Sequence, residues 1–374
     1  MKVLMQIRQN VFNLSGGDTT QMIKTKEALE AKGIQVDLSL ELRPDVTPYD
    51  VVHLFNLTRV QETFIQARNA RAAGKPVALS TIYWPTAEFE RGAASGLRGL
   101  LGRHLSVDSM ERLKAIGKYV LRGERGEGAR HLMVNSYSKM QLEILENSDV
   151  LLPNALTELN KIEQYLGFKS RNYVVVPNAV DVSSIHEVLA EDSGEFSRYQ
   201  GWVACIGRID IRKNQLNLIK AIEGTDYKVV FVGKKSPGHI EYANKVVSII
   251  EDNPNMEWIE QMSNKDVYRL CKECRVSALP SWFETPGLVS LEAAAMGCNI
   301  VVSPEGTTRD YFGNNAFYCD VNDPSSIRSA LDAAYAADYD GSFRNRILNE
   351  YTWERAAEKT IEGYELALRS ANES

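Results

Sequence analysis

Two glutamates with seven residues between them, Glu284 and Glu292, give the clearest sign of chemistry in this sequence. The surrounding segment, 277–300, is typical of a buried strand, a bend at 285–287 and a helix that begins near Leu288. A helix N-terminus offers unpaired N–H groups to an anion, and carboxylates accept hydrogen bonds from hydroxyls. The pattern predicts a site for a phosphate that carries a hydroxyl-rich group. The alternative is an ordinary strand and helix with two solvated glutamates.

Two cations come earlier in the same half of the chain. Arg208 and Lys213 directly follow an expected strand at 202–206, and we expect them at the same edge of the sheet as Glu284. A guanidinium offers a planar fork and an ammonium a point charge, and the two together suit a diphosphate. A solvated helix start is the alternative for the cations alone. With the two glutamates they form a set that a nucleoside diphosphate attached to a sugar would satisfy.

The elements that must position these residues alternate between apolar strands and amphipathic helices. Strands are expected at 2–7, 34–40, 50–54, 76–83, 150–152, 173–176, 202–206, 228–232, 256–259, 276–279 and 299–302. Near-continuous apolar strands separated by helices indicate parallel sheets covered on both faces. The predicted fold class is therefore α/β, with two Rossmann-like doubly wound domains that face a cleft.

The length of 374 residues also favours two domains, because a single hydrophobic core rarely grows so large. Residues around 181–198 are acidic and polar without a clear period, so we place the boundary there. The N-terminal domain is predicted to span 1–182 and the C-terminal domain 183–352. The apolar spacing in 353–374 predicts a last helix, and we expect this helix to cross back to the first domain.

A glycine pair, Gly16 and Gly17, separates the first expected strand from a helix. Glycine allows a ligand to approach the backbone where the helix dipole is positive. The full dinucleotide fingerprint and the lysine-bearing P-loop are both absent from the sequence.

Composition narrows the class of protein. A net charge of -6 argues against nucleic acid as a partner. No secretory signal or apolar run of the roughly 20 residues that span a bilayer is present, so we expect a cytoplasmic protein. The five cysteines all lie in the second half and predict no disulfide framework, and the single CxxC at 271–274 lacks partners at metal-binding spacing.

Residues 86–131 interrupt the strand and helix rhythm with a basic segment. They contain nine Lys or Arg against six Asp or Glu, and Arg98 and Arg103 lie among leucines at helical spacing. A basic amphipathic helix can lie on an anionic membrane surface or meet an anionic acceptor. Two interpretations stay open for this basic insertion. It could be a helical lid whose leucines pack on its own domain, or a segment that touches the inner face of the membrane peripherally.

Four stretches of the chain resemble glycosyltransferase family 4, whose members have the GT-B fold. They are GGDTTQ near the start, VVVPNAVD at 174–181, CIGRIDIRKNQ, and LPSWFETPGLVSLEAAAMGCNIVVS. The resemblance covers nearly the whole chain outside 86–131. It implies a retaining transfer of a sugar from a nucleoside-diphosphate sugar to a glycan or glycolipid acceptor, in bacterial cell-surface polysaccharide or glycolipid synthesis. No metal or other cofactor is expected.

The resemblance also implies roles for the charged residues. Arg208 and Lys213 would hold the diphosphate and stabilise the charge that develops as it leaves. Glu284 would accept hydrogen bonds from the donor sugar, and Glu292 from the ribose. Further donor-binding positions are implied at Gly16, Gly17, Gly207, Ile259, Thr285, Pro286, Gly287 and Leu288.

One position departs from the family pattern in the first domain. The family commonly has a histidine at the end of the strand that ends here in Tyr83. A phenol can donate a hydrogen bond but cannot replace the proton chemistry of an imidazole near neutral pH. We keep Tyr83 as a catalytic candidate and add His53, at the end of the preceding strand. A hydrogen-bonded histidine inside the core is the alternative for His53.

Two other functions are compatible with the fold that the resemblance implies. One is a sugar-nucleotide epimerase, and the other is a catalytically silent scaffold that binds a partner enzyme. The joint presence of Arg208, Lys213, Glu284 and Glu292 argues against a silent scaffold.

Overall fold

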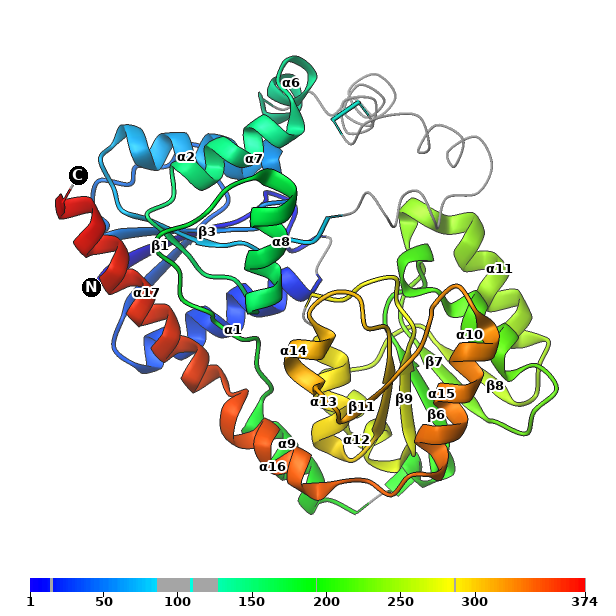
Figure 1. The fold of residues 1–374 in the computed structure, drawn as a ribbon. Coiled ribbons are helices and arrows are strands. Elements are labelled where there is room, and N and C mark those ends of the chain that lie inside the picture. Colours follow the sequence, from blue (N-terminus) through cyan, green and yellow to red (C-terminus); the bar gives the residue numbers. More distant parts are fainter. Residues whose placement is uncertain (14–15, 86–107, 110–126, 193, 286, 374) are drawn as a thin grey trace. The chain divides into compact units, whose positions relative to one another are not determined.

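The computed structural model describes residues 1–13, 16–85, 108–109, 127–192, 194–285 and 287–373. The chain divides into two compact units (Figure 1). Unit 1 contains 1–178 and 353–374, and unit 2 contains 179–352. The division at 178/179 lies four residues before the boundary expected from the sequence. Each unit is built on a parallel sheet, which confirms the predicted fold class of two Rossmann-like α/β domains. That the domains face a cleft stays a prediction.

The sheet of unit 1 has the strand order β2-β1-β3-β4-β5, and its pairs are parallel. The strands are β1 Lys2–Gln6, β2 Gln35–Ser39, β3 Val51–Phe55, β4 Val77–Ser80 and β5 Val150–Leu151. The helices described in unit 1 are α1 Gly17–Ala31, α2 Val60–Ala72, α6 Glu127–Val134, α7 Tyr137–Glu146, α8 Leu156–Leu166 and α17 Trp353–Glu373.

Helices cover both faces of this sheet, as the apolar strands predict. Val52 and Leu54 of β3 belong to the core shared with α2 and α7, whereas Val51 and Phe55 belong to the core shared with α1 and α17. This alternation follows from the two-residue period of a strand. The last helix, α17, packs against α1 and lies beside it in Figure 1.

The sheet of unit 2 has the order β11-β10-β9-β6-β7-β8. Its strands are β6 Val203–Ile206, β7 Val229–Val232, β8 Met256–Ile259, β9 Val276–Leu279, β10 Asn299–Val302 and β11 Ala316–Tyr318. The α-helices described in unit 2 are α9 Val182–Ala190, α10 Gln215–Ile222, α11 Ile240–Glu251, α12 Asn264–Glu273, α13 Leu288–Met296, α14 Thr308–Phe312, α15 Pro324–Ala336 and α16 Gly341–Glu350. Short 3₁₀ turns lie at Gly194–Tyr199, Ile211–Lys213 and Pro237–His239.

Two expectations about secondary structure are wrong. The segment 173–176 forms only an isolated bridge from Tyr173 to Leu151 instead of a strand. Residues 182–190, which appeared to lack a period, form helix α9. Its start is capped by Asp181, whose side chain accepts a hydrogen bond from the Ser184 N–H. An aspartate before a helix is a sequence signal for an N-cap, and it was overlooked.

Three expectations concern the membrane, the cysteines and metals. The basic segment 86–131 lies mostly outside the described residues, and with it Arg98 and Arg103. No helix among the described residues has the length and apolar character needed to cross a membrane. All five cysteines are buried free thiols. Within the described ranges, His, Cys, Asp and Glu side chains form no group of three that could hold a metal ion.

Candidate functional site

The charged site residues of unit 2 gather at the carboxyl ends of two neighbouring strands. Because β6 pairs with β9, the loops that follow these strands meet at one edge of the sheet. Lys213 Nζ lies 2.6 Å from Glu284 Oε1, although the two residues are 71 positions apart in the chain. Both side chains are largely buried, with 13% of Lys213 and 8% of Glu284 exposed.

A third charged side chain, Arg212, completes this cluster. Its Nη1 donates to the Phe283 carbonyl at 3.0 Å and lies 3.5 Å from Glu284 Oε1. The 3₁₀ turn that carries Arg212 is capped by Asp210, whose side chain accepts a hydrogen bond from the Arg212 N–H. The sequence analysis did not select Arg212 as a site residue. Its position next to Lys213 in the sequence could have identified it as a second cation near Glu284.

Burial and charge act in opposite directions on Glu284. Burial alone would raise the pKa of its carboxyl, but the nearby charges of Lys213 and Arg212 outweigh this effect and hold the pKa at about 2. Burial lowers the pKa of Lys213, and the charge of Glu284 offsets only part of that change. Glu284 is therefore an ionised carboxylate at neutral pH, held against two cations.

Arg208 occupies a different position from the other cations. It is exposed, and its main-chain carbonyl accepts from Gln215 Nε2 at 2.9 Å. It follows Gly207, the residue directly after β6, whose N–H donates to the Val232 carbonyl at 2.8 Å. The Ile259 carbonyl accepts from the Gly233 N–H, so the three strands β6, β7 and β8 end at one level.

A glycine that was not predicted fixes the backbone of Glu284. Gly306 forms an isolated bridge with Glu284, and the next residue, Thr307, donates its N–H to the Glu284 carbonyl at 2.9 Å. A Cβ added to Gly306 would lie 2.0 Å from that carbonyl oxygen. Only glycine allows the two backbones to approach this closely.

The helix that follows Glu284 begins at Leu288, as the sequence predicted. Gly287 precedes it with a φ of +76°, which favours glycine, while Thr285 is partly buried and Pro286 lies outside the described residues. Near this helix start, the Ser290 hydroxyl is buried and has no hydrogen-bond partner among the residues that the structure describes. A buried unpartnered hydroxyl marks a position where a ligand could complete the hydrogen bonding.

Glu292 lies one helical turn further along α13 and has a different environment. Its Oε1 accepts from the Tyr268 hydroxyl at 3.0 Å. Although part of the residue is exposed, burial of the carboxyl and the charge of Asp181 raise its pKa to about 7, and the Tyr268 hydrogen bond only reduces this shift. The two glutamates therefore differ in charge near neutral pH.

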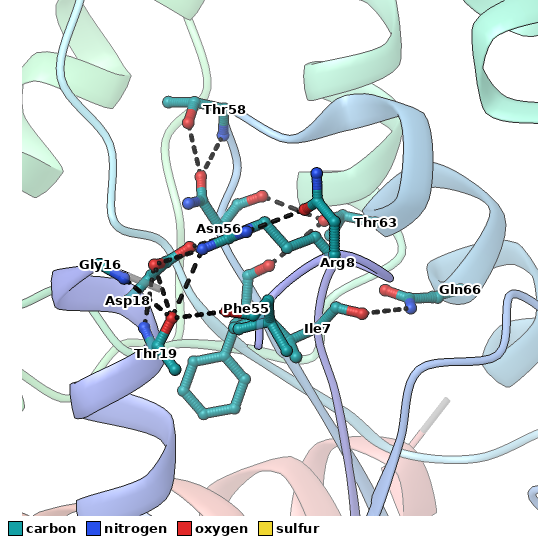
Figure 2. A network of polar contacts seen from close by, with 12 residues as sticks. Ile7, Arg8, Gly16, Asp18, Thr19, Phe55, Asn56, Thr58, Thr63 and Gln66 are labelled. Carbon is teal, nitrogen blue, oxygen red and sulfur yellow. Dashed lines mark hydrogen bonds and ion pairs between the residues drawn. The ribbon is translucent and has the colours of Figure 1, made fainter. Parts of the chain in front are cut away.

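In unit 1, the glycine loop is braced by a buried arginine (Figure 2). Arg8 is 3% exposed, and its Nε and Nη2 atoms bond the two carboxylate oxygens of Asp18 at 2.8 and 3.0 Å. The Gly16 N–H donates to Thr19 Oγ1 at 3.1 Å. A Cβ on Gly17 would meet nothing within 4 Å, so the protein's own atoms do not require glycine there. No sequence pattern predicted that Arg8 braces this loop.

His53 is placed within the core of unit 1, which corrects its selection as a catalytic candidate. Its Nδ1 lies 2.8 Å from the Tyr364 hydroxyl and its Nε2 2.9 Å from the Ser80 hydroxyl. The side chain is 1% exposed, and burial lowers its pKa to about 3. His53 therefore joins β3, β4 and α17 as a neutral core residue, which is the alternative given above.

Tyr83 lies just beyond β4, where the family pattern has a histidine. It is 5% exposed, and burial raises the pKa of its phenol to about 12. The phenol therefore stays protonated at neutral pH and can donate a hydrogen bond but cannot act as a base. Its main-chain N–H donates to Glu158 Oε1 at 2.8 Å.

Comparisons with known proteins agree with this architecture. Residues 194–350 match the family model described as glycosyl transferases group 1. An N-acetylgalactosamine-N,N'-diacetylbacillosaminyl-diphospho-undecaprenol 4-alpha-N-acetylgalactosaminyltransferase of Campylobacter jejuni is 25% identical over 174 residues, which are 46% of either chain. A D-inositol 3-phosphate glycosyltransferase of Nocardioides is 22% identical, and the match covers 96% of this chain and 87% of the relative. The match to the Campylobacter relative thus spans about half of that protein.

Solved structures share the fold at low identity. Sucrose-phosphate synthase from Thermosynechococcus elongatus has a TM-score of 0.69 at 14% identity and is covered over 98% of both chains. The catalytic domain of starch synthase IV from Arabidopsis thaliana has a TM-score of 0.66 at 13% identity, with 98% of this chain and 99% of that one covered. These structures show that the chain shares the GT-B fold, and its stretch 194–350, which lies within unit 2, is similar to glycosyl transferases group 1.

Proposed function

We propose that the chain is a retaining glycosyltransferase that moves a sugar from a nucleoside-diphosphate sugar to a glycan or lipid-linked acceptor. One observation carries the proposal. The ionised Glu284 is held by Lys213 and Arg212 at the adjoining ends of β6 and β9, directly before helix α13. Cations for a diphosphate, a helix N-terminus and carboxylates for hydroxyls are thus combined in the domain that matches the glycosyl transferase model.

Each charged residue receives a role in donor binding. Lys213 and Arg212 bind the diphosphate, with the exposed Arg208 as a further cation at the same strand end. Binding of the diphosphate to Lys213 releases Glu284 to accept hydrogen bonds from the donor sugar. Glu292 accepts from the ribose hydroxyls, because a carboxylate can receive two donors at once.

The proposed transfer keeps the configuration of the anomeric carbon. The bond from that carbon to the diphosphate oxygen breaks, and a bond to the acceptor oxygen forms on the same face of the sugar. The acceptor's hydroxyl proton passes to the leaving phosphate oxygen, while Lys213 and Arg212 stabilise the charge that develops there. The scheme requires no metal or other cofactor.

A lipid-linked acceptor in bacterial cell-surface glycan or glycolipid synthesis is the proposed context. The Campylobacter relative is named as a transferase that acts on a diphospho-undecaprenol-linked sugar. The excess of Lys and Arg over Asp and Glu in 86–131 supports contact with an anionic surface. The protein would then work in the cytoplasm, at the inner face of the membrane.

A donor screen tests this function. The full chain is incubated with UDP-, GDP-, ADP- and dTDP-sugars and a polyprenyl-diphosphate-linked sugar as acceptor, with and without EDTA, and turnover and product configuration are followed by NMR. We expect one donor to be consumed with retention and without loss in EDTA. An inverted product or loss of turnover in EDTA would contradict the mechanism. Interconversion of the donor sugar without transfer would indicate an epimerase. If no donor is turned over, the protein would be a catalytically silent scaffold.

A further inference from the structure

The turn that follows β4 in unit 1 has an unusual backbone. Ile82 has a φ of +42°, in the left-handed region that β-branched residues avoid. Such a conformation persists only where the surrounding structure holds it, and it is concentrated at functional sites. The turn carries Tyr83 at the carboxyl end of β4, the edge at which parallel α/β sheets bind their ligands.

A buried carboxylate holds both sides of this turn. Glu158 of α8 is 0% exposed, and its Oε1 accepts from the Thr81 hydroxyl and from the Tyr83 N–H, the latter at 2.8 Å. Its Oε2 accepts from the Asn154 N–H at 2.9 Å. The two bonds to Oε1 come from the residues immediately before and after Ile82, so the carboxylate closes the turn around the strained residue.

Buried amides connect Glu158 to the helix of the glycine loop. Asn154 Oδ1 accepts from Gln21 Nε2 at 2.9 Å, and Gln21 Oε1 accepts from Asn178 Nδ2 at 3.0 Å. All three amide side chains are at most 5% exposed. Gln21 lies on α1, the helix that begins directly after Gly16. The turn after β4 and the glycine loop are therefore fixed to one another through hydrogen bonds inside unit 1.

We propose that Glu158 is a positioning residue: it holds the Thr81–Tyr83 turn in its strained form and so sets where Tyr83 stands. A carboxylate suits this task because it accepts several donors and donates none. Whether Tyr83 then serves glycosyl transfer rests on the function proposed above. That Glu158 holds the turn does not depend on the proposed function. The hold on the turn and the role of Tyr83 in transfer can therefore be tested separately.

The first test reads the turn directly by hydrogen exchange of the Tyr83 amide in the full chain. Glu158→Gln keeps the size of the side chain but replaces one acceptor oxygen with a donor. We expect the Tyr83 amide to exchange at least about tenfold faster, while core amides of β3 are unchanged. Glu163→Gln is the matched control, because Glu163 lies on the same helix with 52% of its side chain exposed. Equal exchange in wild type and Glu158→Gln would overturn the proposal.

A milder variant covers the case in which Glu158→Gln fails to fold. Thr81→Val removes only the hydroxyl donor and leaves the Tyr83 and Asn154 bonds to Glu158 in place. We expect a smaller but measurable increase in exchange at Tyr83. Exchange that rises equally at Tyr83 and throughout the β3 core would indicate general destabilisation and would also overturn the proposal.

The second test separates positioning from donor binding. For Glu158→Gln we expect kcat to fall about tenfold or more, while nucleoside diphosphate affinity by calorimetry stays within about twofold of wild type. A kcat that falls only in step with the folded fraction would show that Glu158 has a structural role alone. If wild type transfers no sugar from any donor, the proposed function fails, but the exchange experiment still decides whether Glu158 holds the turn.

Discussion

At the scale of single residues, the site depends on charges that are buried with their partners. Lys213 and Glu284 lie far apart in the sequence. They form an ion pair because β6 pairs with β9, which brings the loops after these two strands together. Removing one member leaves the other as an uncompensated charge in a poorly solvated position. Substitutions here should therefore affect stability as well as ligand binding, and the two effects need separate measurements.

Lys213→Ala should destabilise the folded protein by about 2–4 kcal/mol, because Glu284 then loses its nearest cation. Urea unfolding of unit 2 measures this loss. Since the pKa of Glu284 is held at about 2, against its ordinary 4.5, the stabilisation is present above pH 4.5 and disappears as the pH falls towards 2. Lys220→Ala on exposed surface is the control. Equal stability of the two variants at pH 7 would refute the role of the ion pair.

Ionisation of Glu292 should make the stability of the folded protein depend on pH with the opposite sign. Its pKa is raised from 4.5 to about 7, so the folded protein binds a proton more tightly than the unfolded chain. Stability should fall as the pH rises from 4.5 through 7. Glu292→Gln removes this titration and should stabilise the protein at pH 8 by about 1–2 kcal/mol, allowing for the partial exposure of the residue. Thermal melts from pH 5 to 8 measure it, and a constant difference between variant and wild type would argue against the raised pKa.

At the scale of elements, short backbone contacts hold the loops that carry the charges. Gly306 brings the loop after β10 against Glu284, which lies in the loop after the neighbouring strand β9. The strands could be predicted from the sequence because strands of a parallel sheet are buried on both faces and therefore appear as apolar runs. The contact of Gly306 could not, because it depends on which strands become neighbours.

Gly306→Ala should destabilise unit 2 by about 3 kcal/mol or more, because its Cβ would overlap the Glu284 backbone and its φ is +97°. Gly313→Ala is the control, since Gly313 also has a positive φ, +52°, but open space around it. Urea unfolding should show a much larger loss for Gly306→Ala than for the control. Similar losses would mean that backbone conformation alone, and not the close approach, requires glycine.

The buried residues that hold the loops within unit 1 also fall outside what sequence reasoning could find. Glu284, Glu292 and Lys213 were selected because spacing and resemblance identify residues near strand ends. Arg8 and Glu158 have no such pattern, because each acts through partners fixed by tertiary packing. The selection of His53 failed for the same reason, since its partner Tyr364 is contributed by the last helix.

At the scale of the whole molecule, the chain is two units joined by two crossings, at 178/179 and 352/353. The alternation of strands and helices was sufficient to predict two α/β domains, and the apolar spacing in 353–374 predicted the last helix. The exact position of the boundary between the units could not be predicted. The acidic segment that contains helix α9 shows no clear helical period, so its sequence resembles a linker.

Deleting residues 353–374 should destabilise unit 1 selectively. Helix α17 buries Ala356, Ala357, Tyr364 and Ala367 against the sheet of that unit, and Tyr364 bonds His53. Without it, that apolar face is exposed to water. We expect calorimetry to show a lower melting temperature for unit 1 and an unchanged transition for unit 2. Loss of both transitions together would contradict the division into separately stable units.

Titration of the full chain with UDP, GDP, ADP and dTDP by calorimetry, comparing wild type, Lys213→Ala and Lys220→Ala, tests whether unit 2 binds a nucleoside diphosphate through Lys213. We expect wild type and Lys220→Ala to bind one of these nucleotides equally well. Lys213→Ala should bind it at least about tenfold more weakly, because a buried cation to the diphosphate is lost. Equal affinity of Lys213→Ala and wild type, or no binding of any nucleotide to wild type, would contradict the assignment of this site.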